Sequence, residues 1–582
     1  MGQLPRLAYE YDERVVTDVF AGYRRKARIG DGEFYNTRNL TSAGYPLLTN
    51  RRKRGHVRTL RAPGGLLAKE KLAFVEDGAL WYDGERTPLT ALTPGRKQLV
   101  SMGAAIVVFP DRLYYNTANP TDFGSLEAAY SSAGNVEYAL CREDGTPYPA
   151  PTVSDTAPAE PADGALWIDS AKSVHVLRQW NAALTQWAEI PTVFTRLRFI
   201  SEGEIPALFR KYDGVTVTGA AAAMDGAHVL RAVGGGEGER DWIVVAGLLE
   251  ENMTQTEGSV KLERRVPEMD FVIECKNRLW GCRYGADGEK SLNEIYCCAL
   301  GDFKNWRQYM GLSTDSWTAS VGSDGPWTGA VSYLGCPMFF KENRIHRVTV
   351  SPTGAHQLTE TVCRGVQEGC AGSLQVVNET LLYKSRADIC AYQGSFPESI
   401  SDALGEERYS EASAGVLGER YYISMKSAAG DWSLFVYDIR RNLWMREDEL
   451  HALGFASLGD ELYCETENAL LALNGTVGTK EPYVAWEAET GLLSYEAPDR
   501  KYVSRYNLRL SMEEGAQLDV YLEYDSSGEW VRQGRVRMKG TRTVTLPVRP
   551  RRCDHLRMKL RGRGDMRLYS VAKILTMGSD VG

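Results

Sequence analysis

The sequence predicts an all-β protein, built from a β-propeller of six to eight blades, an inserted small β domain and a C-terminal β-sandwich. Short apolar runs bounded by Gly, Asp and Asn dominate the chain, and long helical periodicity is nearly absent. A short pattern also recurs at intervals of about 40 residues in the second half of the chain. Apolar residues make up 43% and charged residues 25%, which is the composition of a folded globular protein.

The recurring pattern is a turn followed by a charged residue, an aliphatic residue and an aromatic or histidine residue. It is clearest at residues 111–114, 277–280, 343–346 and 460–463, with looser copies at 77–81 and 379–383. Leu381, Tyr421 and Leu462 follow one another at about 40 residues, the period of a propeller blade. Since one blade cannot bury both of its faces, the blades have to stack around a common axis.

Two segments interrupt or follow the repeats. A Pro- and Ala-rich linker at 146–163 precedes a hairpin-like pair that carries Trp167, Trp180 and Trp187. Alternating apolar and polar segments from 484 onward, separated by turns, are typical of a β-sandwich. The predicted organisation is an N-terminal arm with the first strands (1–60), the first blades (61–140), the inserted β domain (141–248), the remaining blades (249–483) and the sandwich (484–582).

The cysteines and the chain start indicate the compartment. The 11 cysteines are odd in number, form no C-x-x-C and mostly lie in apolar, strand-like runs, so we interpret them as reduced core thiols. No run of 18 apolar residues predicts a membrane span, and the first residues lack the apolar region of a signal peptide. We therefore expect a protein made in a cytoplasm.

The sequence offers no convincing catalytic motif. The seven histidines lack zinc-ligand spacing, no G-x-S-x-G occurs, and the glycine-rich stretch 234–238 lacks the Lys-Ser/Thr of a P-loop. Asp31 and Glu33 share one strand face, as a glycosidase pair would, but exposed strands often show this spacing. We expect no enzyme, no catalytic or metal-binding residue and no cofactor.

Tryptophans in the repeat region suggest one alternative, a sugar-binding groove, against the simpler interpretation of packing within and between blades. The residues concerned are Trp280, Trp306, Trp317, Trp327, Trp432 and Trp444.

Charge is distributed unevenly along the chain. The whole chain carries −8, whereas residues 532–567 contain 13 Lys/Arg and two acids, a net +11, which leaves −19 for the remainder. Such patches suit head-to-tail contacts between copies, although a solvated strand face or a DNA-facing patch would look the same. The candidate interface residues are Arg51, Arg52, Lys53, Arg54, Arg535, Arg537, Arg549, Arg551, Arg552, Arg557, Arg561 and Arg563.

Several long segments resemble tail proteins of phages and prophages of Gram-positive anaerobes. They include IGDGEFYNTRNLTSAGYPLLTNRRKRG (29–55), GCPMFFKENRIHRV (335–348) and KYVSRYNLRLSMEEGAQLDVYLEY (501–524). The resemblance covers most of the chain outside 140–248. By analogy of layout, the chain is also similar to the β-propeller nozzle proteins of short-tailed phages.

This resemblance implies a structural virion protein, located in the phage tail, that extends the portal–adaptor channel and helps to retain and conduct the genome. The implied partners are further copies in a ring, expected to be sixfold, adaptor and fibre proteins, and DNA that passes without sequence readout. The alternatives are a tail protein that binds or depolymerises host-surface glycans, and a host-encoded extracellular propeller involved in adhesion.

Overall fold

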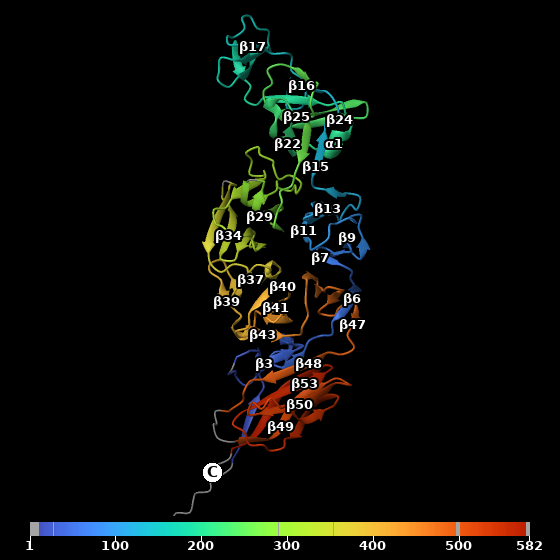
Figure 1. Cartoon of the computed structure of the whole chain (residues 1–582), viewed down its shortest axis with the longest axis vertical. Coiled ribbons are helices and arrows are strands. Elements are labelled where there is room, and N and C mark those ends of the chain that lie inside the picture. The colour runs from blue at the N-terminus through green and yellow to red at the C-terminus, as the bar shows by residue number, and fades with distance from the viewer. Residues whose placement is uncertain (1–10, 27, 289, 353, 496–500, 578–582) are drawn as a thin grey trace, which may run out of the picture.

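The computed structural model describes residues 11–26, 28–288, 290–352, 354–495 and 501–577. The molecule is elongated and has three parts, with the propeller between the inserted domain at one end and the sandwich at the other (Figure 1). Helices are few and short: α1 (Glu204–Leu208) and the 3-10 turns η1 (Ser42–Gly44), η2 (Ala222–Met224), η3 (Ala371–Ser373) and η4 (Asp402–Leu404). Within the described ranges, none has the length and apolarity needed to cross a lipid bilayer.

The described residues form seven propeller blades, each an antiparallel sheet of four or more strands. Blades 1 to 3 are β7–β10 (Pro63–Ala68, Leu72–Glu76, Ala79–Tyr82, Glu85–Arg86), β11–β14 (Gln98–Met102, Ala105–Phe109, Leu113–Asn116, Phe123–Ser125) and β28–β31 (Phe271–Glu274, Leu279–Asp287, Lys290–Cys297, Trp317–Ser320). Blades 4 to 6 are β32–β35 (Gly329–Tyr333, Cys336–Lys341, Arg344–Val350, His356–Val362), β36–β39 (Gln375–Val377, Thr380–Lys384, Ile389–Tyr392, Glu398–Ser399) and β40–β43 (Tyr409–Leu417, Arg420–Ser427, Trp432–Asp438, Leu443–Arg446).

Blade 7 closes the ring with a strand from the other end of the chain. It combines β44 (Gly454–Leu458), β45 (Glu461–Glu465) and β46 (Ala469–Ala472) with β6 (Gly55–Thr59) and β47 (Thr479–Lys480). The pairs are Leu471 with His56 and Leu470 with Arg58. The innermost strand of blade 7 contacts that of blade 1, which completes the circle.

The prediction of an all-β propeller is confirmed, and the seven blades fall within the expected six to eight. Leu381, Tyr421 and Leu462 each lie on the second strand of a blade and are fully buried. Ile345 and Tyr114, by contrast, lie on third strands. The pattern therefore marks a strand that follows a hairpin turn, and this can be the first or the second hairpin of a blade. Both hairpins need the same local sequence, a turn followed by a buried strand.

The inserted domain spans 128–264 and enters between blades 2 and 3, so that it begins earlier and ends later than the predicted 141–248. Its first sheet contains β15 (Ala128–Ser131), β27 (Lys261–Arg264), β22 (Gly214–Thr218) and β23 (Gly226–Val229). Its second sheet contains β24 (Ala232–Gly236), β25 (Glu239–Ala246), β21 (Phe194–Arg198), β16 (Val136–Cys141) and β26 (Met253–Gln255). The third contains β17 (Thr152–Ser154), β18 (Leu166–Asp169), β19 (Val176–Asn181) and β20 (Gln186–Glu189).

A buried polar cluster fixes the inserted domain to the propeller. Arg264 donates to a carboxylate oxygen of Asp213 at 2.5 Å, and Asn305 of blade 3 donates to the other oxygen at 3.1 Å. The carbonyl-type oxygen of Asn305 in turn accepts from the backbone N–H of Gly214 at 2.9 Å. Because buried charges need such partners, this cluster holds the two bodies in one arrangement.

The sandwich draws its strands from both ends of the chain. One sheet, here called the outer sheet, comprises β4 (Leu40–Thr41), β5 (Leu48–Asn50), β54 (Met566–Met577), β49 (Lys501–Met512), β52 (Gly540–Pro547) and β1 (Tyr11–Thr17). The other, the inner sheet, comprises β3 (Glu33–Arg38), β48 (Ala485–Thr490), β53 (Leu556–Arg563), β50 (Gln517–Tyr524) and β51 (Val531–Val536). Phe34, Leu40 and Leu48 lie in the same core as Leu508 and Leu560, so much of the predicted N-terminal arm belongs to the sandwich.

One continuous sheet joins the propeller to the sandwich. The last strand of blade 6 pairs with β2 (Gly22–Tyr23) through Trp444 and Tyr23, and β2 runs parallel to β3 of the inner sheet. The sheet therefore contains ten strands, from the propeller axis to the far edge of the sandwich. The inserted domain lies at the opposite end of the molecule (Figure 1).

Candidate functional site

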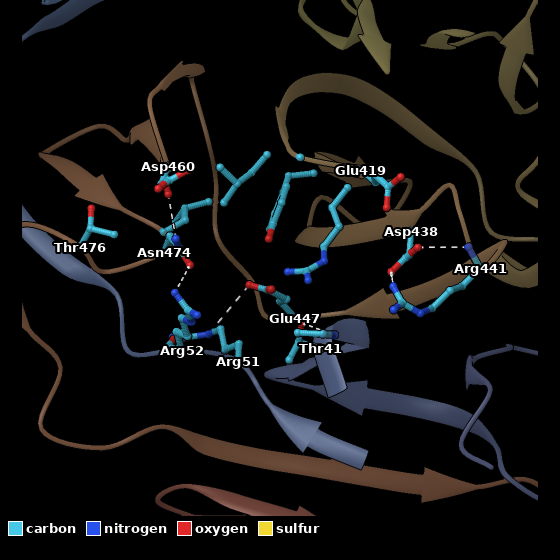
Figure 2. Close-up of a pocket in the computed structure, with 16 residues that line it drawn as sticks. Thr41, Arg51, Arg52, Glu419, Asp438, Arg441, Glu447, Asp460, Asn474 and Thr476 are labelled. Carbon is cyan, nitrogen blue, oxygen red and sulfur yellow. Dashed lines mark hydrogen bonds and ion pairs between the residues drawn. The ribbon is translucent and has the colours of Figure 1, made fainter. Parts of the chain in front are cut away.

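A polar pocket of about 520 Å³ lies where the N-terminal strands of the sandwich meet blades 6 and 7 (Figure 2). Its lining carries both signs of charge, with no histidine or cysteine. The charged residues are Arg51, Arg52, Arg420, Arg441, Glu419, Asp438, Glu447 and Asp460. We call this the junction pocket, since three parts of the chain that are distant in sequence contribute to it.

Two buried arginines form an ion-pair network at the junction pocket: Arg51 lines the pocket, and Arg54 contacts the lining residue Glu447. Arg54 is paired with Glu447 at 2.7 Å and with Asp448 at 2.6 Å. Arg51 is paired with Glu481 at 2.7 Å, in the segment that leads from blade 7 to the sandwich. Both arginine side chains are less than a tenth exposed. The network therefore connects the entry to the propeller, blade 6 and the exit from blade 7.

The pKa shifts show that this network is charged. Burial alone would lower the pKa of Arg54, but the charges of Asp448 and Glu447 raise it above its usual value. Burial would likewise raise the pKa of Asp448 and Glu481, and the neighbouring arginines instead hold both below the usual range. These carboxylates remain ionised at neutral pH, which suits an ion-pair lock.

The rim of the junction pocket is more open. Arg441 donates to Asp438 at 2.7 Å, and the Ser42 hydroxyl donates to the same oxygen at 2.6 Å. Arg52 donates to the side-chain oxygen of Asn474 at 3.1 Å. Tyr422 is buried below the rim, and burial raises its pKa to about 12. A pocket of this kind can accept a polar, charged segment more readily than an apolar ligand.

The structure corrects the prediction that the N-terminal basic cluster faces another copy. Arg51 and Arg54 are buried and paired inside one chain, so their guanidinium groups cannot reach a neighbour. Arg52 and Lys53 lie at the surface, and Lys53 donates to the carbonyl of Pro482 at 3.0 Å. The sequence could not distinguish the buried Arg51 and Arg54 from the surface residues Arg52 and Lys53. The carboxylates that pair with Arg51 and Arg54 lie about 400 residues away in the chain.

Three of the eight C-terminal candidates contact carboxylates on the exposed face of the inner sheet. Arg535 donates to Asp519 at 2.7 Å, Arg557 donates to Glu523 at 3.2 Å, and Arg561 lies 3.9 Å from Glu487. The others are surface residues: Arg537 donates to Gln517, Arg551 lies over Tyr524 and Arg563 over Tyr483, Arg552 also has an interaction partner, and Arg549 is exposed.

The tryptophans of the repeat region mostly pack in the core. Trp280, Trp306, Trp327 and Trp444 are at most 4% exposed, which supports blade packing over a sugar-binding groove. Trp317 and Trp432 differ from these four, because they are only half-buried. Half-buried tryptophans also occur in the inserted domain, where Trp180 and Trp187 face each other across β19 and β20 with ring centroids 5.4 Å apart.

The carboxylates at the start of the chain do not form a pair. Asp31 accepts from Thr17 at 2.6 Å and from Lys573 at 2.5 Å. Glu33 accepts from Arg24 and from the backbone of Gly30. The 11 cysteines are free thiols, nine of them buried. Over the described ranges, no group of three or more His, Cys, Asp or Glu side chains is arranged to hold a metal ion.

Comparison with known proteins gives structural similarity at low identity. No protein-family model and no curated protein matches the chain. The exo-β-1,3-galactanase of Phanerochaete chrysosporium is similar at 7% identity, over 52% of this chain and 94% of that chain, with a TM-score of 0.22. The Trypanosoma rangeli sialidase is similar at 9% identity, over 98% and 96%, with a TM-score of 0.24. The Pyrococcus horikoshii acylaminoacyl peptidase is similar at 10% identity, over 54% and 55%, with a TM-score of 0.23.

These findings overturn one prediction, that the chain is not an enzyme. The similar structures are glycosidases and a peptidase, so the chain is no longer assigned to the non-enzymatic class. Similarity at this identity concerns the fold and assigns no activity or substrate to this chain.

Proposed function

We propose that the protein is a structural component of a phage tail, which forms a ring below the portal and adaptor and extends the channel for the genome. The sequence resemblance in residues 29–55, 335–348 and 501–524 motivates this proposal. The further partners are other copies, adaptor and fibre proteins, and DNA passing without sequence readout.

The observation that carries the proposal is the fusion of three bodies into one elongated unit with distinct ends (Figure 1). The ten-stranded sheet continues from blade 6 into the sandwich, and the ring is closed by β6. The buried pairs of Arg54 and Arg264 reinforce the two junctions. Parts joined by a shared sheet and buried ion pairs suit a tail segment, which has to hold its shape during assembly and genome release.

Mass spectrometry of purified particles tests the proposal. The copy number of this protein is measured against that of the major capsid protein. A fixed low ratio, as for one ring per particle, is the expected result. Protein that is absent from particles, and instead free in the medium or on cells, would refute the tail assignment.

A second candidate function is recognition of a host-surface glycan by the inserted domain. Trp180 and Trp187 lie half-buried on one face of the sheet formed by β17–β20, and Trp167 packs against Trp187. The opposite face buries Leu166, Ile168 and Leu177 in the core of the domain. Half-buried aromatic rings on a sheet face can stack on sugar rings.

Binding of purified cell-wall polysaccharide separates the two candidates. Glycan recognition predicts that the polysaccharide changes tryptophan fluorescence, and that Trp180→Ala with Trp187→Ala abolishes the change. Trp432→Ala on blade 6 is the matched control, since this tryptophan is also half-buried and stacks on His451. Release of reducing ends from the polysaccharide would establish hydrolysis in addition to binding.

A further inference from the structure

The two exposed faces of the sandwich differ in how their cations are paired with carboxylates. On the inner sheet, cations alternate with carboxylates: Arg535 with Asp519, Arg557 with Glu523, and Lys559 with Glu489 at 3.0 Å. Each of these three cations is balanced by a carboxylate on an adjacent strand, whereas Arg563 lies over the Tyr483 ring, so the face is partly neutralised within the chain.

The outer sheet also exposes arginines, on the side that faces away from the core. Strand β49 alternates, with Tyr506, Leu508 and Leu510 in the core and Arg505 and Arg509 exposed on the opposite side. The register places Arg567 beside Ser511 on the same side. Arg14 of β1 and Arg505 both stand opposite Ile574, so Arg14 shares this side too. We call Arg14, Arg505, Arg509 and Arg567 the arginine face.

The arginine face has little carboxylate to balance it. In the parts of the chain that the structure describes, none of these four guanidinium groups has an ion-pair partner, and Arg509 has one weak contact, to the Thr543 hydroxyl at 3.5 Å. The carboxylate on the outward side of β1 is Asp12, which accepts from Thr576 at 2.6 Å. Among the described residues of this face, four cations stand against one acid, a local excess of positive charge on a chain whose net charge is −8.

Hydroxyl and amide groups fill the space between these arginines. The outward residues of the neighbouring strand positions are Asn507, Ser511, Thr541, Thr543 and Thr545. Phosphate oxygens in nucleic-acid complexes are bound by these side-chain types together with arginine. A protein partner would instead call for apolar or aromatic anchors at the centre of the surface, and this stretch of β49 and β52 offers none.

We propose that the arginine face binds the phosphodiester backbone of DNA without reading its sequence. This inference deepens the proposed function and rests on it for the source of the DNA. The inference also changes which cations are assigned to a partner. They are the arginines of the outer sheet, whereas the sequence analysis pointed to the basic segment 532–567 as a whole. The contacts would be to phosphate, so affinity falls steeply with salt and is the same for any sequence.

The test measures binding of the full chain to a short mixed-sequence DNA duplex by fluorescence anisotropy, from about 50 to 200 mM salt. The variant Arg505→Gln/Arg509→Gln/Arg567→Gln should make the plot of log K against log salt less steep, with the magnitude of its slope smaller by about 3. It should also weaken binding at least about tenfold at the lowest salt. The matched control, Arg535→Gln/Arg537→Gln/Arg561→Gln, removes the same charge from the inner sheet and should change affinity less than about twofold. Circular dichroism verifies that both variants are folded.

Three outcomes would overturn the inference. The wild-type chain fails to bind the duplex at low salt, or both triple variants lose binding equally. In the third, the outer-sheet variant leaves DNA binding intact and changes the sedimentation of the protein, which would assign the face to contacts between copies. The particle measurement is independent of these results: a chain absent from particles that still binds DNA through this face would refute the tail assignment alone.

Discussion

Arg54 and Glu447 lie 393 positions apart in the sequence, and their side chains meet at 2.7 Å in the junction between propeller and sandwich. The contact matters because Arg54 stands directly before β6, the strand that closes the ring. Asp448 provides the second carboxylate at 2.6 Å, so the strand is anchored at its entry as well as along its length.

Removing Arg54 should destabilise the molecule strongly. Arg54→Met leaves Glu447 and Asp448 buried without their main counter-charge, which costs about 3–5 kcal/mol. Calorimetry should show the first unfolding transition at a lower temperature. Arg52→Met, which removes an exposed arginine two residues earlier, should leave that transition almost unchanged. Equal effects of the two substitutions would contradict the role given to the buried pair.

Ring closure should depend on Leu470. This residue is 1% exposed and packs with Leu60 and Phe74, which places it between blades 7 and 1. Leu470→Ala should cost about 2–5 kcal/mol and speed hydrogen exchange of β6 and β46. Val57→Ala, at an exposed position of the same closing strand, is the control. If exchange of β6 is unaffected by Leu470→Ala, closure does not depend on this contact.

Gly22 should be needed for the sheet that joins propeller and sandwich. It has φ 87°, and a Cβ atom there would lie 2.5 Å from the carbonyl oxygen of Trp444. Gly22→Ala thus combines backbone strain of about 1 kcal/mol with a steric clash, and should lower the unfolding temperature. Gly418→Ala isolates the strain, because Gly418 has φ 60° and open space around it. A smaller effect at Gly22 than at Gly418 would show that the strand pairing adapts easily.

Stability should fall as the pH decreases from 7 toward 5.5. Burial lowers the pKa of His346 below its usual 6.5, although the adjacent Glu360 acts to raise it. The unfolded chain therefore binds a proton at a higher pH than the folded chain, and stability is lost as the pH falls below about 6.5. His228 and His356 shift in the same direction.

The measurement is the unfolding temperature at both pH values for the wild type and for His346→Gln. The substitution should reduce the difference between the two pH values, since it removes one of the groups that titrate there. His175→Gln, at a part-exposed position in the inserted domain, serves as the control. An unchanged pH dependence in His346→Gln would exclude this histidine as a source.

Sequence periodicity was sufficient for the fold class because blade strands are local. Each of blades 1 to 6 is built from one consecutive stretch of the chain with turns between its strands, and Leu381, Tyr421 and Leu462 mark buried second strands. The sandwich was harder to delimit. Strands such as β3 and β5 come from residues 33–50, which carry no signal of pairing with a segment more than 400 residues away.

The sequence by itself determined an all-β chain with a propeller period, an insertion and a C-terminal sandwich, because alternation and turn chemistry are local properties. Only the tertiary structure decided which charges are free. Arg51, Arg54 and Arg535 look like surface cations in the sequence, yet distant or cross-strand carboxylates neutralise them. Arg505 and Arg509 resemble any alternating strand residues in the sequence, and among the residues that the structure describes they have no carboxylate partner, because the neighbouring strands present hydroxyl and amide groups there. Charge pairing depends on neighbours in space, and for this protein those neighbours come from opposite ends of the chain.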